Sequence, residues 1–357
     1  MSRLSALARR LDELGHDALL VTTPSNIVYL SGFTGTSGYL IVRADGTGVV
    51  ATDARYSERV EDELRDEPGL SFEIAPGRGL GRLPELFAPG TTVGVEADHL
   101  SWSEATETKE RLEGRNVVAT SGLVESLREY KDDEEVALIR AAAEIADASL
   151  AALLDKLRPG ATERDVAWEF AKGVREAGGD AIAYETIVAS GPNASRPHHA
   201  TGDRELAIGD LVIIDAGATV EGYRSDMTRT FVLGPATPRQ QELLDAVLAA
   251  QTAGIAAVTP GIVSSDIDAA CRSSLTRSGL GEWFTHGTGH GVGLDIHEAP
   301  SVHAAATATL APGHVLTVEP GVYLPGEGGV RWEDTIVVTS SGATPLTLAP
   351  KQPIIDT

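Results

Sequence analysis

The sequence predicts an α+β protein of two domains, in which a smaller α/β domain precedes a larger domain made of two pseudo-symmetric halves. Three observations support this prediction. The chain has 357 residues, a length that suggests about two domains, each with its own core. Strand-like and helix-like segments alternate up to about residue 128, which is typical of helices packed on a mixed or parallel sheet. An internal repeat occupies the remainder of the chain.

The first domain is expected to form a sheet with helices packed on it. Alternating or apolar runs predict strands at residues 17–21, 39–42, 48–52, 71–75 and 92–96, and helices at 56–65 and 101–112. Ser101 followed by Glu104 forms a capping box at the start of the second helix. The charged stretch from Arg128 opens a long alanine-rich helix, so we place the domain boundary there, with domains at 1–128 and 129–357.

The second domain contains two copies of one pattern. Pro159-Gly160 is followed by Asp165 and Gly178, and every matched residue recurs 101 positions later, beginning with Pro260-Gly261. Each copy follows an alanine-rich helix and precedes a second helix. A duplicated helix-turn-helix unit with a sheet after each copy predicts pseudo-twofold halves, with an active site in the crevice between them.

Residues 209–234 contain the first pair of candidate ligands. The apolar run 211–214 predicts a buried strand that ends at Asp215, and residues 228–233 predict a second strand. A turn near residues 220–222 would make a hairpin and bring Asp215 roughly opposite Asp226. Two carboxylates in an apolar setting repel each other unless a proton or a cation lies between them. Alternatively, Asp215 caps a strand and Asp226 is a solvated loop residue.

Further polar clusters follow in the second half of the chain. Residues 286–298 contain three histidines and four glycines, and residues 190–199 end in the pair His198-His199. Glu319 and Glu333 each interrupt an apolar strand-like run, where an unpaired carboxylate would cost several kcal/mol. Four carboxylates with His290 form an oxygen-rich ligand set suited to two Mn, Co or Zn ions, and two such ions would hold a hydroxide for hydrolysis at neutral pH.

These motifs resemble the pita-bread metallopeptidases of family M24B, specifically the Xaa-Pro peptidases called prolidase and aminopeptidase P. The resemblance covers nearly the whole chain, with a creatinase-like N-terminal α/β domain before a catalytic domain of the pita-bread fold. It is based on Ile-Asp215-Ala-Gly-Ala, Ser-Asp226-Met-Thr-Arg-Thr, His286-Gly-Thr-Gly-His290-Gly-Val-Gly, Glu319-Pro-Gly and Arg331-Trp-Glu333-Asp.

The resemblance implies a role for each site residue. Two divalent ions would be held by Asp215, Asp226, His290, Glu319 and Glu333, with Asp226 and Glu333 bridging. Glu319 would also transfer the proton of the bridging water, while His198 and His297 would steady the scissile carbonyl. His286 and Arg331 would lie beside the substrate. Because His199 follows His198, either imidazole could meet the substrate.

The expected reaction is hydrolysis of the Xaa-Pro bond at the N-terminus of proline-containing di- or oligopeptides. The same resemblance implies a homodimer.

Methionine aminopeptidase is an alternative, but that family usually lacks the extra N-terminal domain. Creatinase uses the fold without metal and lacks the full ligand set. A non-catalytic pita-bread domain that binds peptides or acts as a scaffold is the alternative from another class.

Two residues depart from the family pattern. Trp332 replaces a small aliphatic residue between Arg331 and Glu333, and we expect it to point away from Glu333 and to affect packing only. His314 stands where a hydrophobic residue is usual.

Composition excludes several other classes of protein. The formal net charge of -23 argues against nucleic acid and anionic membranes as partners, since phosphate binding needs clustered Lys and Arg. Cys271 is the only cysteine, so an intrachain disulfide or a thiolate metal site is impossible, and a cytoplasmic location is expected. The first 14 residues predict an amphipathic helix, and no run approaches the roughly 18 apolar residues of a membrane span.

Overall fold

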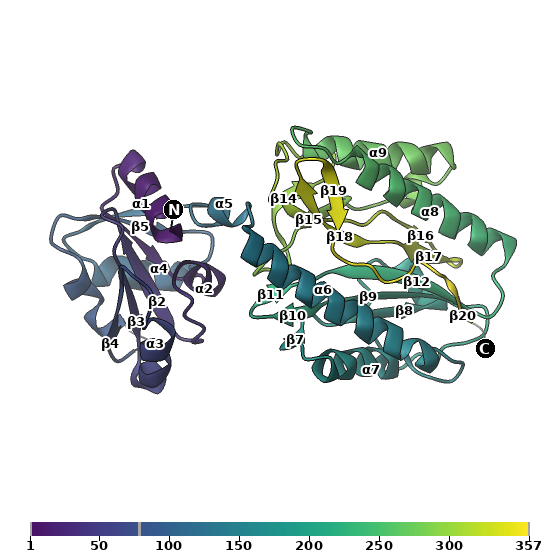
Figure 1. The fold of residues 1–357 in the computed structure, drawn as a ribbon, viewed down its shortest axis with the longest axis horizontal. Helices are drawn as coiled ribbons and strands as arrows, with labels where there is room; N and C mark the ends of the chain where they lie inside the picture. The colour runs from purple at the N-terminus through teal and green to yellow at the C-terminus, as the bar shows by residue number, and fades with distance from the viewer. Residues whose placement is uncertain (1, 78–79, 356–357) are drawn as a thin grey trace. The chain divides into compact units, whose positions relative to one another are not determined.

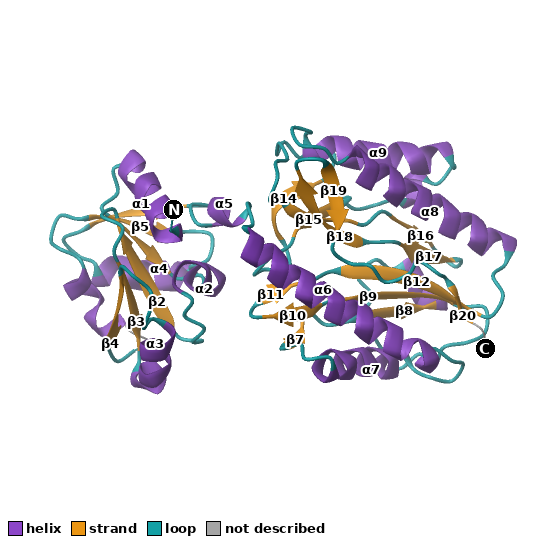
Figure 2. Cartoon of the chain, in the orientation of Figure 1, coloured by secondary structure: helices purple, strands orange, loops and turns teal. Residues whose placement is uncertain are grey.

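The structure is a computed structural model that describes residues 2–77 and 80–355. Its contacts divide the chain into two compact units, Met1–Arg128 and Glu129–Thr357. Figure 1 follows the chain by colour and Figure 2 separates its helices from its strands. Each unit has its own strands and its own buried hydrophobic residues, which form two separate clusters in the second unit. Within the described residues, none of the helices has both the length and the apolar character needed to span a membrane.

The first unit is built on a mixed sheet whose described strands follow the order β4-β3-β2-β1-β5-β6. The β1–β2 and β2–β3 pairs are antiparallel, and the β1–β5, β3–β4 and β5–β6 pairs are parallel. The strands are β1 (Ala18–Val21), β2 (Gly38–Arg43), β3 (Gly48–Thr52), β4 (Leu70–Ile74), β5 (Thr92–Glu96) and β6 (Asn116–Thr120). The helices are α1 (Arg3–Leu14), α2 (Pro24–Ser31), η1 (Ala54–Tyr56), α3 (Ser57–Glu63), η2 (Leu80–Leu86), α4 (Trp102–Arg111) and α5 (Glu125–Arg128).

The predicted strands of this unit are confirmed to within one or two residues. The capping box of Ser101 and Glu104 is also present at the start of α4. The sequence reading missed α2 and β6. Helix α2 has eight residues, too few for a clear helical period, and β6 lies at the sheet edge, where its partly exposed residues blur the alternation.

The second unit begins with the long helix α6. Its elements in the first half are α6 (Asp133–Leu153), η3 (Leu154–Lys156), α7 (Glu163–Glu176), β7 (Ala181–Ile182), β8 (Ile187–Ser190), η4 (Gly191–Ser195), β9 (Leu211–Ala216), β10 (Ala218–Val220), β11 (Tyr223–Arg224) and β12 (Met227–Leu233). Those in the second half are α8 (Pro238–Ala257), α9 (Ser264–Arg277), η5 (Gly281–Trp283), β13 (Gly289–Gly291), β14 (Glu298–Val302), β15 (Val315–Val318), β16 (Gly321–Leu324), β17 (Gly328–Arg331), β18 (Asp334–Thr339), β19 (Gly342–Pro345) and β20 (Ile354–Ile355).

The predicted internal repeat corresponds to two similar halves. Helices α6 and α7 pack with the sheet β20-β12-β9-β8, and α8 and α9 pack with the sheet β14-β13-β15-β18-β19. The matched glycines Gly160 and Gly261 both adopt positive φ, at 85° and 91°. Their amides donate to Leu206 O at 2.9 Å and Leu310 O at 2.7 Å, so each Pro-Gly turn is tied to an equivalent place in its own half.

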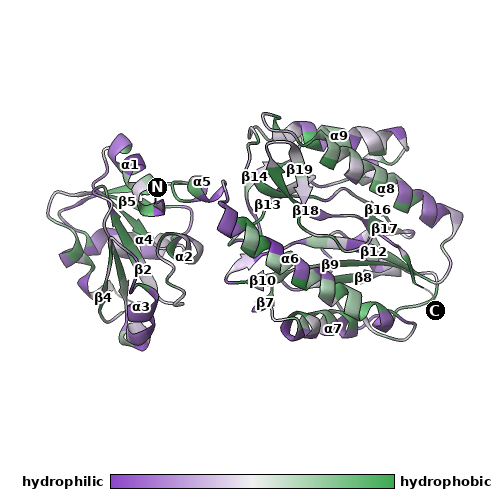
Figure 3. Ribbon diagram, viewed as in Figure 1, coloured by the Kyte–Doolittle hydropathy of each residue, from purple (hydrophilic) through white to green (hydrophobic). Residues whose placement is uncertain are grey.

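Strand β9 lies between two hydrophobic cores. Val212 and Ile214 belong to the core under α6 and α7, whereas Leu211 and Ile213 belong to the core under α8 and α9. A strand buried on both faces has no polar face, which is why the sequence here is a continuous apolar run. Figure 3 shows β8 and β9 in the green of hydrophobic residues.

Candidate metal centre and active site

Two aspartates enter the site from the central strands of the first half. Side chains alternate along a strand, so Asp215 points to the same side as Leu211 and Ile213, toward the second half. On the partner strand, Asp226 shares the face of Thr228, which hydrogen-bonds Glu333 of the second half. The carboxylates therefore face the residues of the other half because of strand parity.

The predicted hairpin is present, but its register differs from the expectation. Asp215 pairs with Thr228, and Asp226 lies two residues earlier as a diagonal neighbour on the same face. The predicted turn is confirmed in the β10–β11 hairpin, where Glu221 and Gly222 both have positive φ, at 48° and 84°. The alternative in which Asp226 is a solvated loop residue is wrong, since Asp226 is 5% exposed.

Two glutamates enter the site from the second half. Glu319 directly follows β15, and its amide donates to Thr288 O at 2.8 Å. Glu333 lies in the break between β17 and β18, and it accepts a hydrogen bond of 2.6 Å from Thr228 Oγ1. Trp332, between these strands, is buried, and its indole N–H donates to Leu244 O of α8 at 3.2 Å. It therefore contributes to packing against α8, as expected.

His290 directs one ring nitrogen at the carboxylates. Its Nδ1 lies 3.0 Å from Gly291 O, which can only accept, so Nδ1 carries the proton. Burial lowers the pKa of His290 to about 4, so the ring is neutral and Nε2 has a free lone pair. That nitrogen lies 3.4 Å from Glu319 Oε1 and 3.6 Å from Asp226 Oδ2. A lone pair aimed at carboxylate oxygens is unfavourable unless a proton or a cation lies between them.

The acids at this point of the fold cannot all be ionised without a further positive charge. Burial, followed by repulsion from neighbouring carboxylates, raises the pKa values of Asp226, Glu319 and Glu333 well above their usual range. Donor atoms of Asp226, His290 and Glu333 lie within 4.8 Å of one another. The residues present therefore fit a divalent metal centre with hard oxygen and imidazole ligands.

Arg331 supplies a permanent positive charge inside the site. Its Nη2 donates to Asp215 Oδ2 at 2.7 Å, its Nε to Thr228 Oγ1 at 3.0 Å and its Nη1 to Tyr323 at 2.8 Å. The Arg331 side chain is 4% exposed. One guanidinium faces four carboxylates, so it offsets only part of their charge.

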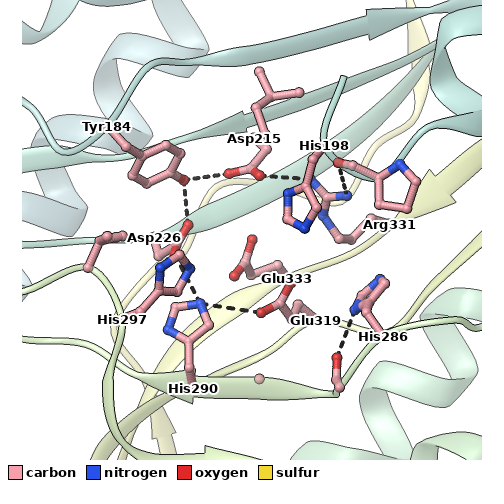
Figure 4. Close-up of a pocket in the computed structure, with 15 residues that line it drawn as sticks. Tyr184, His198, Asp215, Asp226, His286, His290, His297, Glu319, Arg331 and Glu333 are labelled. Carbon is pink, nitrogen blue, oxygen red and sulfur yellow. Dashed lines mark hydrogen bonds and ion pairs between the residues drawn. The ribbon is translucent and has the colours of Figure 1, made fainter. Parts of the chain in front are cut away.

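Tyr184 is a site residue that the sequence analysis missed. Figure 4 shows its hydroxyl between Asp215 and Asp226, within hydrogen-bonding distance of both and 2.5 Å from Asp215 Oδ1. Its single proton can be donated to only one of the two carboxylates at a time. Burial and the nearby carboxylates raise the pKa of Tyr184 well above its usual range, so the hydroxyl stays a donor. A tyrosine between two short strands has no distinguishing sequence pattern, so only the fold reveals this contact.

The acids line a cavity of about 310 Å³ together with four histidines, one of which is His290. His198 lies on its wall with Pro197, and His297 lies near His290 with ring centroids 4.2 Å apart. His286 also lines the cavity, but both of its ring nitrogens have partners in the protein. Its Nδ1 lies 2.7 Å from Gly287 O and its Nε2 lies 2.9 Å from the Tyr323 hydroxyl.

The structure distinguishes the two consecutive histidines. His198 lines the cavity, whereas the imidazole of His199 lies 2.8 Å from Glu163 of α7. The side chain of His199 is 10% exposed and that of Glu163 is fully buried. Of this pair, His198 is the residue placed to meet a bound ligand.

The chain is similar over its whole length to known peptidases. Residues 137–340 match the model of metallopeptidase family M24, and residues 3–130 match the creatinase/prolidase N-terminal domain. A curated relative, the Xaa-Pro dipeptidase of Pyrococcus furiosus, is 34% identical over 97% of both chains. The solved structure of an Xaa-Pro dipeptidase from Bacillus anthracis has a TM-score of 0.93 and 36% identity, covering 99% of this chain and 98% of that one.

An X-Pro aminopeptidase structure from Thermotoga maritima is also similar, with a TM-score of 0.88 and 30% identity, covering 98% of this chain and 100% of that one. Both domain models fall where the fold has its two compact units. The predicted architecture, a creatinase-like domain followed by a pita-bread domain, is confirmed. The chain belongs to the metallopeptidase family M24, in its prolidase-like M24B branch.

Proposed function

We propose that this protein hydrolyses the Xaa-Pro bond at the N-terminus of peptides, using two divalent ions held by the four carboxylates and His290. The observation that carries the proposal is one cavity lined by Asp215, Asp226, Glu319, Glu333 and His290, in which the Nε2 of His290 faces Asp226 and Glu319. The relatives named Xaa-Pro dipeptidase and X-Pro aminopeptidase support this choice of substrate class.

The proposed ligand roles are those of the sequence analysis. Asp215 would hold one ion, His290 and Glu319 would hold the second, and Asp226 and Glu333 would be shared between the two. Such ions, when bound, polarise a carbonyl group and lower the pKa of water. Mn, Co and Zn are all compatible with this set of hard oxygen and imidazole ligands.

The residues of the chain then handle protons and position the substrate. Glu319 lines the cavity, where its carboxylate takes a proton from the attacking water. The same carboxyl group then gives that proton to the prolyl nitrogen as the bond breaks. His198 and His297 line the same cavity and donate hydrogen bonds to the scissile carbonyl oxygen as its negative charge grows.

His286 and Arg331 act through their fixed positions. Burial, and then the positive charge of Arg331, lower the pKa of His286 to about 4, so its ring is neutral. The Tyr323 hydroxyl accepts from Arg331 and donates to His286 Nε2, while His286 Nδ1 donates to Gly287 O. We propose that this chain of hydrogen bonds holds the cavity wall on which proline-containing substrates bind.

A comparison of peptides tests this function directly. The protein is freed of metal with a chelator, supplied with Mn, Co or Zn, and given Xaa-Pro, Xaa-Pro-Yaa and Xaa-Ala peptides. We expect cleavage of at least one Xaa-Pro series with at least one ion, and little cleavage of Xaa-Ala. The ratio between the di- and tripeptides separates dipeptidase from aminopeptidase activity. A protein inactive with every ion would favour a peptide-binding scaffold. The homodimer and the cytoplasmic location remain predictions.

A further inference from the structure

A fully buried carboxylate outside the metal centre fixes the loop that contains His198. Glu163 is the first residue of α7, and its side chain accepts hydrogen bonds from four residues of the segment 190–202. Ser190 donates through its amide and its hydroxyl at 2.8 Å each, and Asn193 Nδ2 donates at 2.9 Å. His199 Nε2 lies at 2.8 Å and the Gly202 amide at 3.2 Å.

These contacts keep Glu163 ionised inside the protein. Burial opposes the charge, but the hydrogen bonds from Asn193, His199 and Ser190 lower the pKa of Glu163 below its usual value. A buried carboxylate that satisfies so many donors of one segment fixes the path of that segment, because moving the loop would leave a buried charge unsatisfied.

His198 lies between two residues whose positions are fixed by contacts with other parts of the protein. On one side, Arg331 Nη1 lies 3.4 Å from Pro197 O, and on the other, His199 is bound to Glu163. The His199 imidazole contacts α7, whereas the His198 imidazole lines the cavity. His199 thus binds the loop to α7, while His198 faces the cavity. The position of His198 depends on the contact between His199 and Glu163.

The second half contains a comparable arrangement, which argues against a chance contact. Asp268 of α9 is 1% exposed, accepts from Thr288 Oγ1 at 2.9 Å and pairs with Arg272 at 2.6 Å. Arg272 in turn donates to the backbone oxygens of Phe284 and His286. In each half, an acid on the second helix of the repeat therefore restrains the loop that contains a histidine of the cavity.

We propose that Glu163 and His199 form a positioning pair that holds His198 at the scissile peptide bond. This inference rests on the proposed function, because it takes His198 to contact the substrate. A positioning pair acts only through His198, so its removal should lower kcat more than it changes KM. It should also have no effect where His198 is already absent.

A double-mutant cycle with metal-loaded enzyme tests the pair. Glu163→Gln keeps the size and one acceptor, and His199→Leu removes the donor. We expect each to lower kcat on an Xaa-Pro peptide by about 10- to 100-fold, the usual range for residues that orient a catalytic group, with KM changed less than about 3-fold. In the His198→Ala background, the same changes should lower kcat by less than about 2-fold. His199→Gln, which keeps a donor, should restore part of the activity.

The adjacent ion pair of Arg164 and Asp203 provides a matched control. It joins the same helix to the same loop at 2.5 Å, but its side chains are 65% and 72% exposed, so Asp203→Ala should leave kcat unchanged. The inference would be overturned if the Glu163 and His199 variants lost as much kcat in the His198→Ala background as in the presence of His198. A fall in kcat of the same size in Asp203→Ala would overturn it as well. If Glu163→Gln does not fold, the His199→Leu and His199→Gln variants complete the same cycle. An unsubstituted protein that cleaves no Xaa-Pro peptide would overturn the proposed function and this inference together, whereas cleavage with unaffected variants would overturn the inference alone.

Discussion

Ionisation of the carboxyl groups of Asp226, Glu319 and Glu333 is favoured by a bound cation. Their pKa values are raised by burial and then by neighbouring carboxylates. Arg331 donates to Asp215, and the Tyr184 hydroxyl lies between Asp215 and Asp226. Arg331 is the cationic side chain that contacts this cluster, and its ion pair is with Asp215, so the charges of the other three acids would be offset by a bound metal.

The stability of the metal-free protein should fall as the pH rises. A group whose pKa is higher in the folded than in the unfolded state stabilises the fold fully below its unfolded pKa, and this contribution is lost as the pH rises through the folded pKa. The unfolded values of Asp and Glu are 3.8 and 4.5, so the loss begins above about pH 4.5. We expect the gain in melting temperature on adding Mn²⁺ to chelated protein to be larger at pH 8 than at pH 5. A gain that shrinks as the pH rises would contradict this account.

Removing the Tyr184 hydroxyl should weaken the metal centre without disturbing the core. Tyr184→Phe keeps the ring but removes the hydroxyl that lies between Asp215 and Asp226. Outer-shell partners of this kind typically contribute 10- to 100-fold to metal affinity or activity, and we expect losses of about that size in metal titrations and in kcat/KM. Tyr130→Phe is the control, because Tyr130 is 49% exposed and contacts His314. Changes below about 2-fold in both measurements for Tyr184→Phe would be inconsistent with this role.

At the scale of elements, strands β9, β12 and β18 form the frame of the site. Arg229 of β12 is fully buried and joins these elements: it donates to Asp334 Oδ1 at 2.8 Å, to Ala349 O at 2.9 Å and to the backbone oxygen of Glu333 at 2.5 Å. The ligand Glu333 is thus held through its own backbone as well as through Thr228. Asp334 also binds Lys351 at 2.5 Å, which ties the C-terminal segment to the same frame.

Breaking this buried ion pair should cost substantial stability. Arg229→Met leaves the buried Asp334 with Lys351 as its remaining cationic partner and removes the donor to the backbone oxygens of Glu333 and Ala349. Removing one member of a buried pair typically costs about 3–5 kcal/mol. We expect a matching fall in the urea midpoint of the metal-free protein. Arg239→Met is the control, since its side chain is 44% exposed and its pairs with Glu242 and Glu327 should contribute about 1 kcal/mol or less. Equal urea midpoints for the two variants would show that the buried contacts of Arg229 do not stabilise the fold.

The sequence revealed the strands of the site better than their register. The continuous apolar run before Asp215 indicated a buried strand because β9 faces a core on each side. The pairing of Asp215 with Thr228 was missed, because residues 217–226 hold a separate small hairpin that displaces Asp226 from the expected position. Gly217 marks the point of close approach, where a Cβ would lie 1.9 Å from Ser225 O.

At the scale of the whole molecule, the duplication explains the distribution of the site residues. Asp215, Asp226 and His198 come from the first half, and His290, Glu319 and Glu333 come from the second. The repeat and its polar motifs are visible in the sequence, so the two halves and the acids and histidines that line the cavity could be predicted. The contacts of Tyr184, Glu163 and Asp268 could not, since hydrogen bonds between distant segments leave no local periodicity.

The central claim, that this convergence of carboxylates is a metal centre for hydrolysis, is tested most directly by metal content and activity measured together. Elemental analysis and Xaa-Pro hydrolysis are compared for the unsubstituted protein and for Asp226→Asn, which removes one proposed bridging carboxylate and keeps its size. For the unsubstituted protein we predict about two ions per chain and activity. For Asp226→Asn we predict a folded protein with fewer ions and a kcat/KM at least about 1,000-fold lower, because the metal is expected to supply several kcal/mol of transition-state stabilisation. Full activity in Asp226→Asn, or activity in the unsubstituted protein after complete removal of metal, would contradict the claim.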